Sequence, residues 1–266
     1  MNTVSKVIIT GASSGIGRKT AEFLKNRGYE IIGVSRHKPE DVSFEYQLCD
    51  LSDETSIVAC TEAIAARHEQ VDALVNCAGV GVSGALEYAN AKDIDHIFDV
   101  NIKGTILFTQ KIIPLLRRSQ KAKIINIGSV AGPLTIPFQT LYSMTKSALR
   151  SFSEGLRMEL KPFAIDVCLL MPGDTRTTFT TNRQKGATDK TSPYGNRIER
   201  SIAKMEQDEQ KGKDPLTVAK AIHKLLKKKR MPVAKTIGFE YRLFLLLNKL
   251  LPKTWVIRIL YRRYGR

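Results

Sequence analysis

Ser129, Tyr142 and Lys146 bring a hydroxyl, a phenol and an ammonium group together within one short stretch of the sequence. The apolar, β-branched run at 123–127 ends in a glycine, which predicts that Ser129 follows the carboxyl end of a buried strand. Apolar residues then recur at helical spacing from about residue 140, so Tyr142 and Lys146 should lie one turn apart on one helix face. Such a trio could hold a carbonyl oxygen and exchange a proton with it.

The phenol needs a changed environment to exchange protons near neutral pH, because the ordinary pKa of tyrosine is ~10. A nearby ammonium favours phenolate, so we expect Lys146 to lower the pKa of Tyr142. Taken alone, a Tyr-x-x-x-Lys pair is more often a surface tyrosine beside a solvated lysine. The elements around the pair must therefore decide between a surface pair and an active site.

A glycine-rich turn near the amino terminus predicts a binding site for a dinucleotide. Residues 6–10 have the pattern of a buried strand, and a helix pattern runs to about Arg27. A glycine turn between a strand and a helix directs backbone amides and the positive helix end at a pyrophosphate. The candidate cofactor-binding residues here are Gly11, Ser13, Ser14, Gly15, Ile16 and Gly17.

The next two predicted strands, at 30–34 and 44–49, end in residues that could recognise adenosine. In dinucleotide-binding folds an acid after the second strand binds the ribose of NAD, whereas a basic group accommodates the 2′-phosphate of NADP. Arg36 stands at this point and indicates NADP, although it could be an ordinary surface arginine. Asp50 and Leu51 follow the third strand and could lie near the adenine, with helix capping by Asp50 or Ser52 as the competing role.

Two asparagines are further candidates. Asn76 ends a predicted fourth strand at 72–76, and Ala78 and Gly79 follow in a second small-residue turn that lets backbone approach the cofactor. Asn101 is an amide on the mostly apolar face of one or two helices between residues 91 and 118. It could simply satisfy a core hydrogen bond, or it could hold a water molecule or a main-chain bend at the site.

A further predicted strand at 164–170 runs into a turn that could bind the nicotinamide end of a cofactor through Pro172, Gly173, Thr175 and Thr177, and 232–236 could form a last edge strand. Six alternations of strand and helix predict an α/β fold with a doubly wound parallel sheet of the Rossmann type. In this class ligand groups converge at the carboxyl ends of the strands, where all of these candidates stand.

The sequence predicts one domain at 1–237 and a basic, amphipathic helical extension at 238–266. Within the domain, the polar segment 179–213 reads as a mobile lid over the substrate. In the extension, apolar residues recur on one helix face from Phe239 to Leu251. This face could pack on the domain as a lid, which is the commoner use of such a face, or lie on an anionic membrane surface.

Together these motifs, in this order, resemble the short-chain dehydrogenase/reductase family over roughly residues 5–236. They include the glycine turn, Asn76 to Gly79, Asn101, Ser129, the Tyr142-Ser-Met-Thr-Lys146 motif, and Pro172-Gly173 with Thr177. The family pattern Asn-Asn-Ala-Gly has Cys77 at its second position here. Arg36 makes the chain similar to NADP-preferring members, including some hydroxysteroid and retinol dehydrogenases.

The resemblance implies an NADP(H)-dependent oxidoreductase that interconverts a secondary alcohol and a ketone or aldehyde on a hydrophobic substrate. Tyr142 would be the general acid/base, and Lys146 would lower its pKa and bind the nicotinamide ribose. Ser129 would hold the substrate oxygen, and Asn101 would anchor a water molecule. The resemblance also implies a homodimer or homotetramer formed through helices at 102–118 and 140–160. A non-catalytic NADP-binding regulator is the alternative function.

Composition limits the remaining possibilities. The net charge of +16 is concentrated at 220–266, which holds fourteen basic residues and one acid. Basic charge alone gives no support for nucleic-acid binding. The four scattered cysteines predict neither disulfides nor a metal site. With no signal peptide or membrane-spanning run, a cytoplasmic location is expected, with membrane association through 238–266 as an addition to it.

Overall fold

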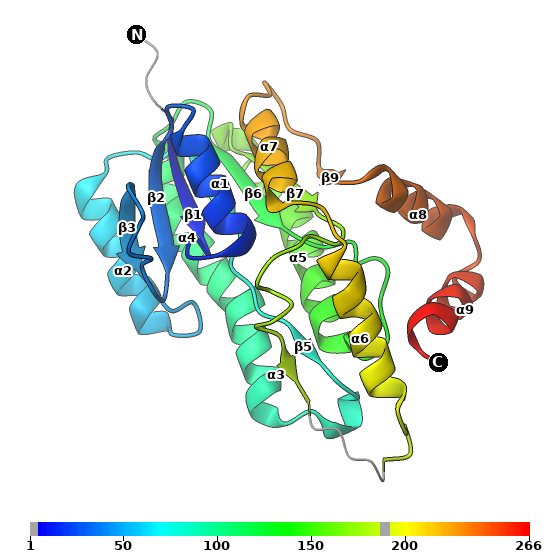
Figure 1. The fold of residues 1–266 in the computed structure, drawn as a ribbon. Coiled ribbons are helices and arrows are strands. Elements are labelled where there is room, and N and C mark those ends of the chain that lie inside the picture. Colours follow the sequence, from blue (N-terminus) through cyan, green and yellow to red (C-terminus); the bar gives the residue numbers. More distant parts are fainter. Residues whose placement is uncertain (1–4, 187–191) are drawn as a thin grey trace.

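The computed structural model describes residues 5–186 and 192–266. A parallel sheet of seven strands lies at its centre, in the order β3-β2-β1-β4-β6-β7-β9 (Figure 1). A second, two-stranded sheet pairs β5 with β8. The bounds are β1 Lys6–Thr10, β2 Glu30–Ser35, β3 Glu45–Leu48, β4 Ala73–Asn76, β5 Val82–Ser83, β6 Lys123–Ile127, β7 Asp166–Met171, β8 Gln184–Lys185 and β9 Ala234–Thr236.

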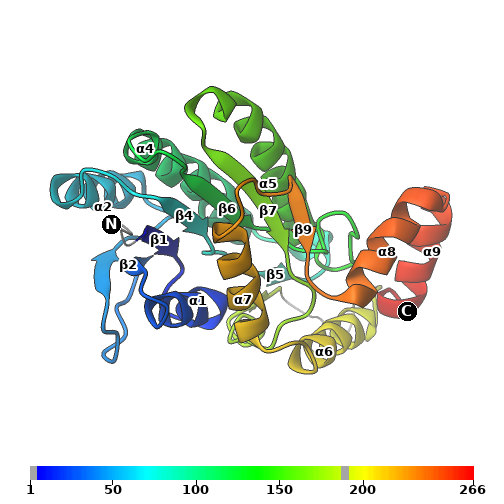
Figure 2. The ribbon, with the colours of Figure 1, turned by 90° about the horizontal axis from the view of Figure 1, so that it is seen from above.

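Helices cover both faces of the large sheet, which confirms the predicted doubly wound fold (Figure 2). Helices α1 and α7 pack together on one face, and α2, α4 and α5 lie on the other. The bounds are α1 Gly15–Lys25, α2 Glu54–Arg67, α3 Ala91–Phe98, α4 Thr105–Arg117, α5 Thr140–Glu159, α6 Arg197–Gln210, α7 Pro215–Leu226, α8 Phe239–Leu250 and α9 Lys253–Tyr264. Short 3-10 turns occur at Leu86–Tyr88 and Lys161–Phe163.

The central strands are apolar throughout because both of their faces are covered. Successive side chains of a strand point to opposite faces, so neighbours in the sequence enter different cores. Thus Ile8 packs in the core under α2 and α4, whereas Val7 and Ile9 pack in the core under α1 and α7. All three are fully buried. This double burial fixes the strand register and holds the carboxyl ends of the strands in one line.

The start of α2 corrects one sequence prediction. Its first turn is capped by Asp53, whose carboxylate accepts hydrogen bonds from the backbone N–H groups of Thr55 (3.1 Å) and Ser56 (3.0 Å). Asp50 and Ser52 do not cap the helix. The Asp50 carboxylate instead accepts hydrogen bonds from the N–H and hydroxyl of Ser52, at 2.9 and 2.7 Å. The Asp50 carboxylate is therefore bonded within the turn that follows β3 and is not the cap of α2.

Within the described residues, one group of side chains has the composition of a metal site, formed by Glu30, Glu45 and His68. Both ring nitrogens of His68 are already engaged, Nδ1 with Lys6 Nζ at 2.8 Å and Nε2 with Glu45 at 3.0 Å. Lys6 Nζ also lies 3.4 Å from the Glu30 carboxylate. The group is therefore an ion-pair cluster that joins β1, β2 and β3. The four cysteines are free.

The segment predicted as a lid contains β8 and α6, and its residues 187–191 lie outside the described part of the chain. Beyond β9, helices α8 and α9 lie at the outer side of the molecule (Figures 1 and 2). No helix in the described chain combines the length and apolar character needed to cross a bilayer. The apolar face predicted for 239–251 is exposed, since none of the residues of α8 is buried.

Candidate active site

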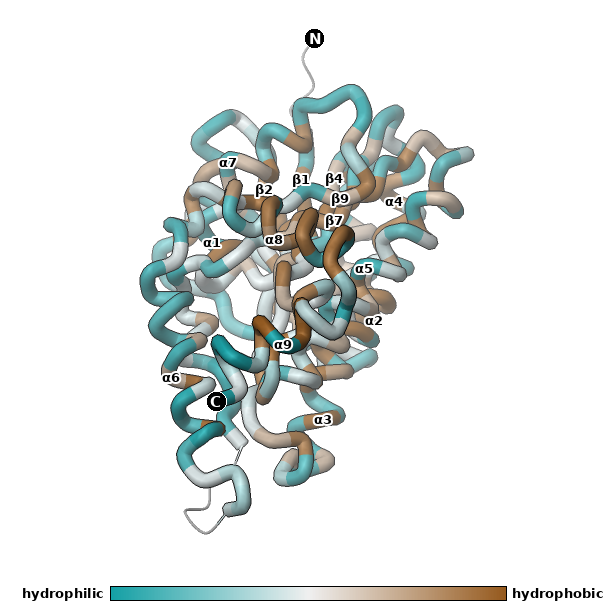
Figure 3. The backbone as a smooth tube through the Cα atoms, turned by 90° about the vertical axis from the view of Figure 1, so that its right-hand side faces the viewer, coloured by the Kyte–Doolittle hydropathy of each residue, from teal (hydrophilic) through white to brown (hydrophobic). Residues whose placement is uncertain are grey.

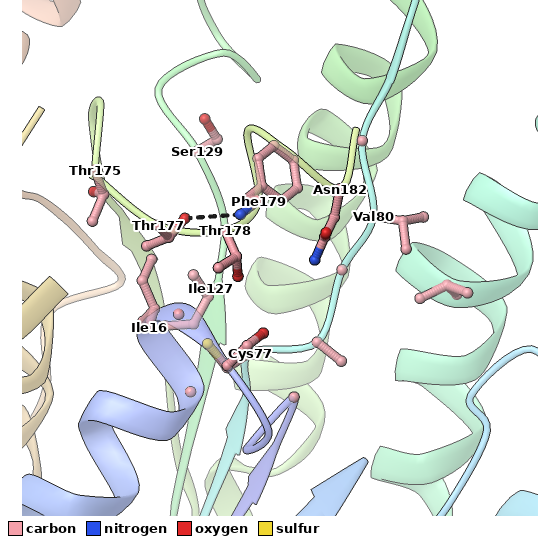
Figure 4. A pocket seen from close by; sticks show the side chains of 18 of the residues that line it. Ile16, Cys77, Val80, Ile127, Ser129, Thr175, Thr177, Thr178, Phe179 and Asn182 are labelled. Atoms are coloured by element: carbon pink, nitrogen blue, oxygen red, sulfur yellow. Dashed lines mark hydrogen bonds between the residues drawn. The ribbon is translucent and has the colours of Figure 1, made fainter. Parts of the chain in front are cut away.

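A cavity of about 840 Å³ opens along the carboxyl ends of the strands. Figure 4 shows part of its wall, where Thr177 and Phe179 lie on the segment after β7, opposite Ile16 and Cys77. Of the predicted site residues, Asn76 and Asn101 lie outside this wall. The structure brings the others together around the cavity, namely Gly11, Ser13, Ser14, Gly15, Ile16, Gly17, Arg36, Asp50, Leu51, Ala78, Gly79, Ser129, Tyr142, Lys146, Pro172, Gly173, Thr175 and Thr177.

The glycine turn has a backbone that other residues would not adopt easily. Gly11 has φ +69°, and a Cβ placed on it would lie 2.9 Å from the Ala78 backbone. A Cβ on Gly17 would lie 2.2 Å from the Gly11 carbonyl oxygen. At the start of α1, Ser14 makes no side-chain capping bond and the first turn carries no acidic residue. The first amides of α1 are thus left to bind an anion, so this end of the cavity fits a cofactor phosphate.

Arg36 and Asp50 mark the outer part of this cofactor end. Arg36 is exposed at the cavity wall after β2. Burial tends to raise the pKa of Asp50, but hydrogen bonds from Ser52 and the charge of Arg36 outweigh it and hold the pKa below its usual value. The Asp50 carboxylate therefore stays ionised at neutral pH beside a cationic side chain.

Tyr142 and Lys146 come from the first turns of α5, as the helical spacing predicts. The ammonium nitrogen of Lys146 lies 5.6 Å from the centre of the Tyr142 ring and donates a hydrogen bond to the carbonyl oxygen of Ile127 (3.1 Å). Ser129 follows β6, where its Oγ accepts a hydrogen bond from Ala131 N (3.1 Å). The ring of Phe179 lies 5.5 Å from that of Tyr142. A phenol, a hydroxyl and an ammonium group therefore share one wall of the cavity.

The pKa values at this wall differ from the sequence expectation. Burial raises the pKa of Tyr142 to about 12, although the neighbouring Ser129 hydroxyl opposes the rise. Burial also lowers the pKa of Lys146 to about 8. The expected lowering of the Tyr142 pKa by Lys146 is therefore wrong for this arrangement, because removal from water disfavours both charged forms. At neutral pH the phenol is protonated and can donate a proton.

Asn101 lies behind the cavity wall, in a π-helical turn at Asp99–Gly104 that joins α3 to α4. Its Oδ1 accepts a hydrogen bond from Val80 N (2.8 Å), and its Nδ2 donates to Val80 O (3.0 Å) and Thr145 Oγ1 (3.1 Å). A Cβ built on Gly79 would lie 3.3 Å from Asn101 Oδ1 and 3.5 Å from Lys146 Nζ. Asn101 thus satisfies core hydrogen bonds, occupies a helix distortion and ties the loop after β4 to α5.

Asn76, predicted as a cofactor-binding residue, lies outside the cavity wall. Its Nδ2 donates hydrogen bonds to Asn126 Oδ1 (2.8 Å) and Thr109 Oγ1 (2.9 Å), inside the core between the sheet and α4. The N–H groups of Cys77 and Ala78 are held by Thr10 Oγ1, at 3.0 and 3.2 Å. Asn76 therefore supports the strands from within, and Thr10 shapes the turn that borders the cavity.

The other end of the cavity is formed by residues that the sequence did not single out. They come from the segment after β7, from α6 and from the end of α9, and include Phe179, Asn182, Gln184, Met205, Asp208, Glu209 and Tyr264. The prediction of a lid at 179–213 pointed to the segment but gave no pattern that selects individual side chains. Tyr264 lies 56 residues beyond Asp208, yet its hydroxyl donates to that carboxylate at 3.0 Å.

The loop that carries Pro172 and Gly173 is attached to α8. The hydroxyl of Tyr241 donates a hydrogen bond to Asp174 Oδ2 (2.6 Å) and accepts one from Asp174 N (3.1 Å). The Tyr241 ring lies so close to Gly173 that a Cβ there would be 2.0 Å from it. Burial raises the pKa values of both Tyr241 and Asp174. The extension after β9 thus holds the loop at the cofactor end of the cavity.

Comparisons with known proteins agree with this geometry. Residues 5–188 match the family model described as short chain dehydrogenase. The chain is 35% identical over 234 residues to a 3-ketodihydrosphingosine reductase from Bacteroides thetaiotaomicron, and the alignment covers 87% of each protein. It is 32% identical over 253 residues to a probable short-chain type dehydrogenase/reductase, VdlC, from Helicobacter pylori, with 93% of each covered.

A solved structure of another protein has the same fold as this chain over nearly the full length of both. A short-chain dehydrogenase from Streptomyces avermitilis matches with a TM-score of 0.81 and 27% identity, over 94% of each chain. The shared fold and the extent of the sequence matches agree with one another. This chain belongs to the short-chain dehydrogenase/reductase family of oxidoreductases.

Proposed function

We propose that this protein is an NADPH-dependent reductase of a ketone carried on a long apolar chain. The observation that carries the proposal is the placement of Ser129, Tyr142 and Lys146 on one cavity wall that begins at a phosphate-binding helix end. A regulator that only binds NADP would have no use for this trio. The protonated state of Tyr142 at neutral pH favours reduction, in which the enzyme donates a proton.

The residues of this chain divide the reaction between them. When bound, NADPH would supply a hydride to the carbonyl carbon of the substrate. Ser129 donates a hydrogen bond to the carbonyl oxygen as negative charge develops there, and Tyr142 transfers its proton to that oxygen to complete the alcohol. Lys146 binds the cofactor ribose and provides a positive charge next to the phenolate that results. Asn101 acts as a positioning residue for Val80 and Thr145, and its anchoring of a water molecule stays a prediction.

The preference for NADPH rests on Arg36. We expect Arg36→Asp to raise the KM for NADPH by about 10- to 100-fold, since a charge-assisted hydrogen bond is typically worth about 1.5–3 kcal/mol. The KM for NADH should fall or stay unchanged. Lys92→Asp makes the same type of charge change at an exposed position on α3 and should alter neither value. Steady-state kinetics with both cofactors measures the effect, and a native preference for NADH would reject the assignment.

A sphingoid-type ketone is the first substrate to test. The likeness to a 3-ketodihydrosphingosine reductase supports a long-chain ketone. The apolar side chains of Phe179, beside Tyr142, and of Met205 on α6 also line the cavity and could contact such a chain. We expect kcat/KM for NADPH-dependent reduction to rise with alkyl length in a series of 3-ketones, because more apolar surface is buried. A flat series would remove the long-chain part of the proposal. Intact NADPH binding with no reduction of any ketone would favour the regulator.

We also propose a homodimer or homotetramer formed through α4 and α5. Apolar side chains remain exposed on both helices, including Ile106 on α4 and Met144 and Met158 on α5. A second copy would bury them.

A further inference from the structure

Exposed apolar side chains are concentrated on the last two helices. Among the described residues, seventeen large apolar side chains are exposed, and ten of them lie between residues 239 and 261. We refer to these ten as the apolar face. They are Phe239, Leu243, Phe244, Leu246, Leu247, Leu250, Trp255, Ile257, Ile259 and Tyr261. Figure 3 shows α8 and α9 toward the viewer, with brown, hydrophobic stretches along both.

The two helices attach to the domain largely through other residues, although Tyr261 of the apolar face also accepts a hydrogen bond from Arg197 on α6 (3.3 Å). Tyr241 and Leu245 pack against the core that contains Val130 and Leu149. On α8, the exposed positions 239, 243, 246, 247 and 250 fall on one stripe, and positions 241, 245 and 248 fall on the opposite side. Helix α8 thus has apolar side chains on two opposite sides, and each side needs a surface to cover it. The domain covers the side with Tyr241 and Leu245.

The charges around the apolar face indicate which surface covers the exposed side of α8. Residues 238–266 contain seven basic residues and one acid, Glu240, which gives a net charge of +6. The basic residues are Arg242, Lys249, Lys253, Arg258, Arg262, Arg263 and Arg266. A second copy on this face would bring two such charges together, whereas an anionic bilayer surface neutralises them. Exposed Trp255 and Tyr261 suit the headgroup region.

We propose that α8 and α9 lie in the surface of an anionic membrane, with the apolar stripe of α8 and the adjoining Trp255 of α9 toward the lipid. Helices with an apolar stripe flanked by cationic residues bind in this way without crossing the bilayer. The same two helices carry Tyr241, which holds the loop of Gly173, and Tyr264, which lines the cavity. Docking therefore brings the cavity to the membrane surface. The entry of a lipid ketone from this surface rests on the proposed function. The docking of the two helices on a membrane does not depend on that function.

Vesicle flotation of the full-length protein tests the proposal. We expect it to float with phosphatidylcholine vesicles that contain phosphatidylglycerol, and to float at least tenfold less with phosphatidylcholine alone. The combined change Leu246→Ser, Leu250→Ser and Trp255→Ser should reduce the bound fraction at least tenfold. Its matched control is Leu86→Ser, Phe163→Ser and Val233→Ser, three exposed apolar residues outside both the apolar face and helices α4 and α5. A second variant, Arg258→Gln with Arg262→Gln, should lose the preference for phosphatidylglycerol.

Thermal unfolding and NADPH binding verify that each variant is folded. Unchanged flotation of both the serine triple variant and the arginine double variant would overturn the proposal. Analytical ultracentrifugation without vesicles tests the rival occupant, because loss of a dimer in the serine triple variant alone would identify this face as an interface between copies. Flotation is measured without substrate. A protein that floats but reduces no ketone would keep the docking proposal and reject the proposed function.

Discussion

Replacing Tyr142 by phenylalanine is expected to lower kcat for ketone reduction by about 10³-fold, within the range typical of general acid catalysis. The change removes one hydroxyl from a half-buried ring that packs beside Phe179, and it leaves the ring itself in place. NADPH affinity and the melting temperature should therefore stay close to those of the native protein. Stopped-flow or steady-state kinetics, with NADPH binding followed by fluorescence, measures both.

The control for this change is Tyr88→Phe, which removes a hydroxyl that is bonded to Ser192 (2.9 Å) outside the cavity wall. It should leave kcat unchanged. Tyr142 would lose its role as the acid if the Tyr142→Phe variant kept near-native turnover. In that case the proton would have to come from Ser129 or from solvent.

Replacing Lys146 by methionine should abolish most turnover and at the same time make the protein more stable at pH 7. The pKa of Lys146 falls from its ordinary 10.5 to about 8 on burial. At neutral pH the folded protein carries this buried charge, and the fall of the Lys146 pKa on burial corresponds to a destabilisation on the order of 3 kcal/mol. Loss of the hydrogen bond to Ile127 O offsets about 1 kcal/mol. The free energy of unfolding should therefore rise by about 2 kcal/mol.

The difference in stability between the Lys146→Met variant and the native protein should depend on pH. Between pH 8 and pH 10.5 the unfolded chain binds more protons at Lys146 than the folded chain, so native stability rises with pH in that window. The advantage of the Lys146→Met variant should accordingly shrink as the pH is raised from 8 towards 10.5. Urea unfolding at pH 7 and pH 10 measures it, and Lys220→Met, at an exposed position on α7, should show no such change. A variant that is less stable than the native protein at pH 7 would contradict this account.

The sequence by itself determined most of the elements and the cofactor end of the cavity. Local periodicity in the sequence predicts a helix or a strand without knowledge of the fold. It correctly predicted the strands at 6–10 and 123–127 and the helix that carries Tyr142 and Lys146. The glycine turn is equally local, because the positive φ at Gly11 and Gly15 belongs to the turn itself. Once parallel strands are assumed, the residues that follow their carboxyl ends must converge, which placed Ser129 and Gly173 in the same cavity.

Only the tertiary structure decided which side of each helix or strand is buried, and against which other element it packs. Asn76 stands at the end of a strand, like the other candidate residues. Its side-chain amide nevertheless lies in the core, where it donates hydrogen bonds to Asn126 and Thr109, two residues that are distant in sequence. The direction of the Tyr142 pKa shift likewise depends on how completely the ring is removed from water, which no spacing encodes. The apolar stripe of α8 is visible in the sequence. Its exposure could not be predicted, because it results from the opposite side of the helix, with Tyr241 and Leu245, packing on the domain. Burial is a sum over contacts between distant residues, so local pattern predicts an amphipathic helix without predicting what covers each of its faces.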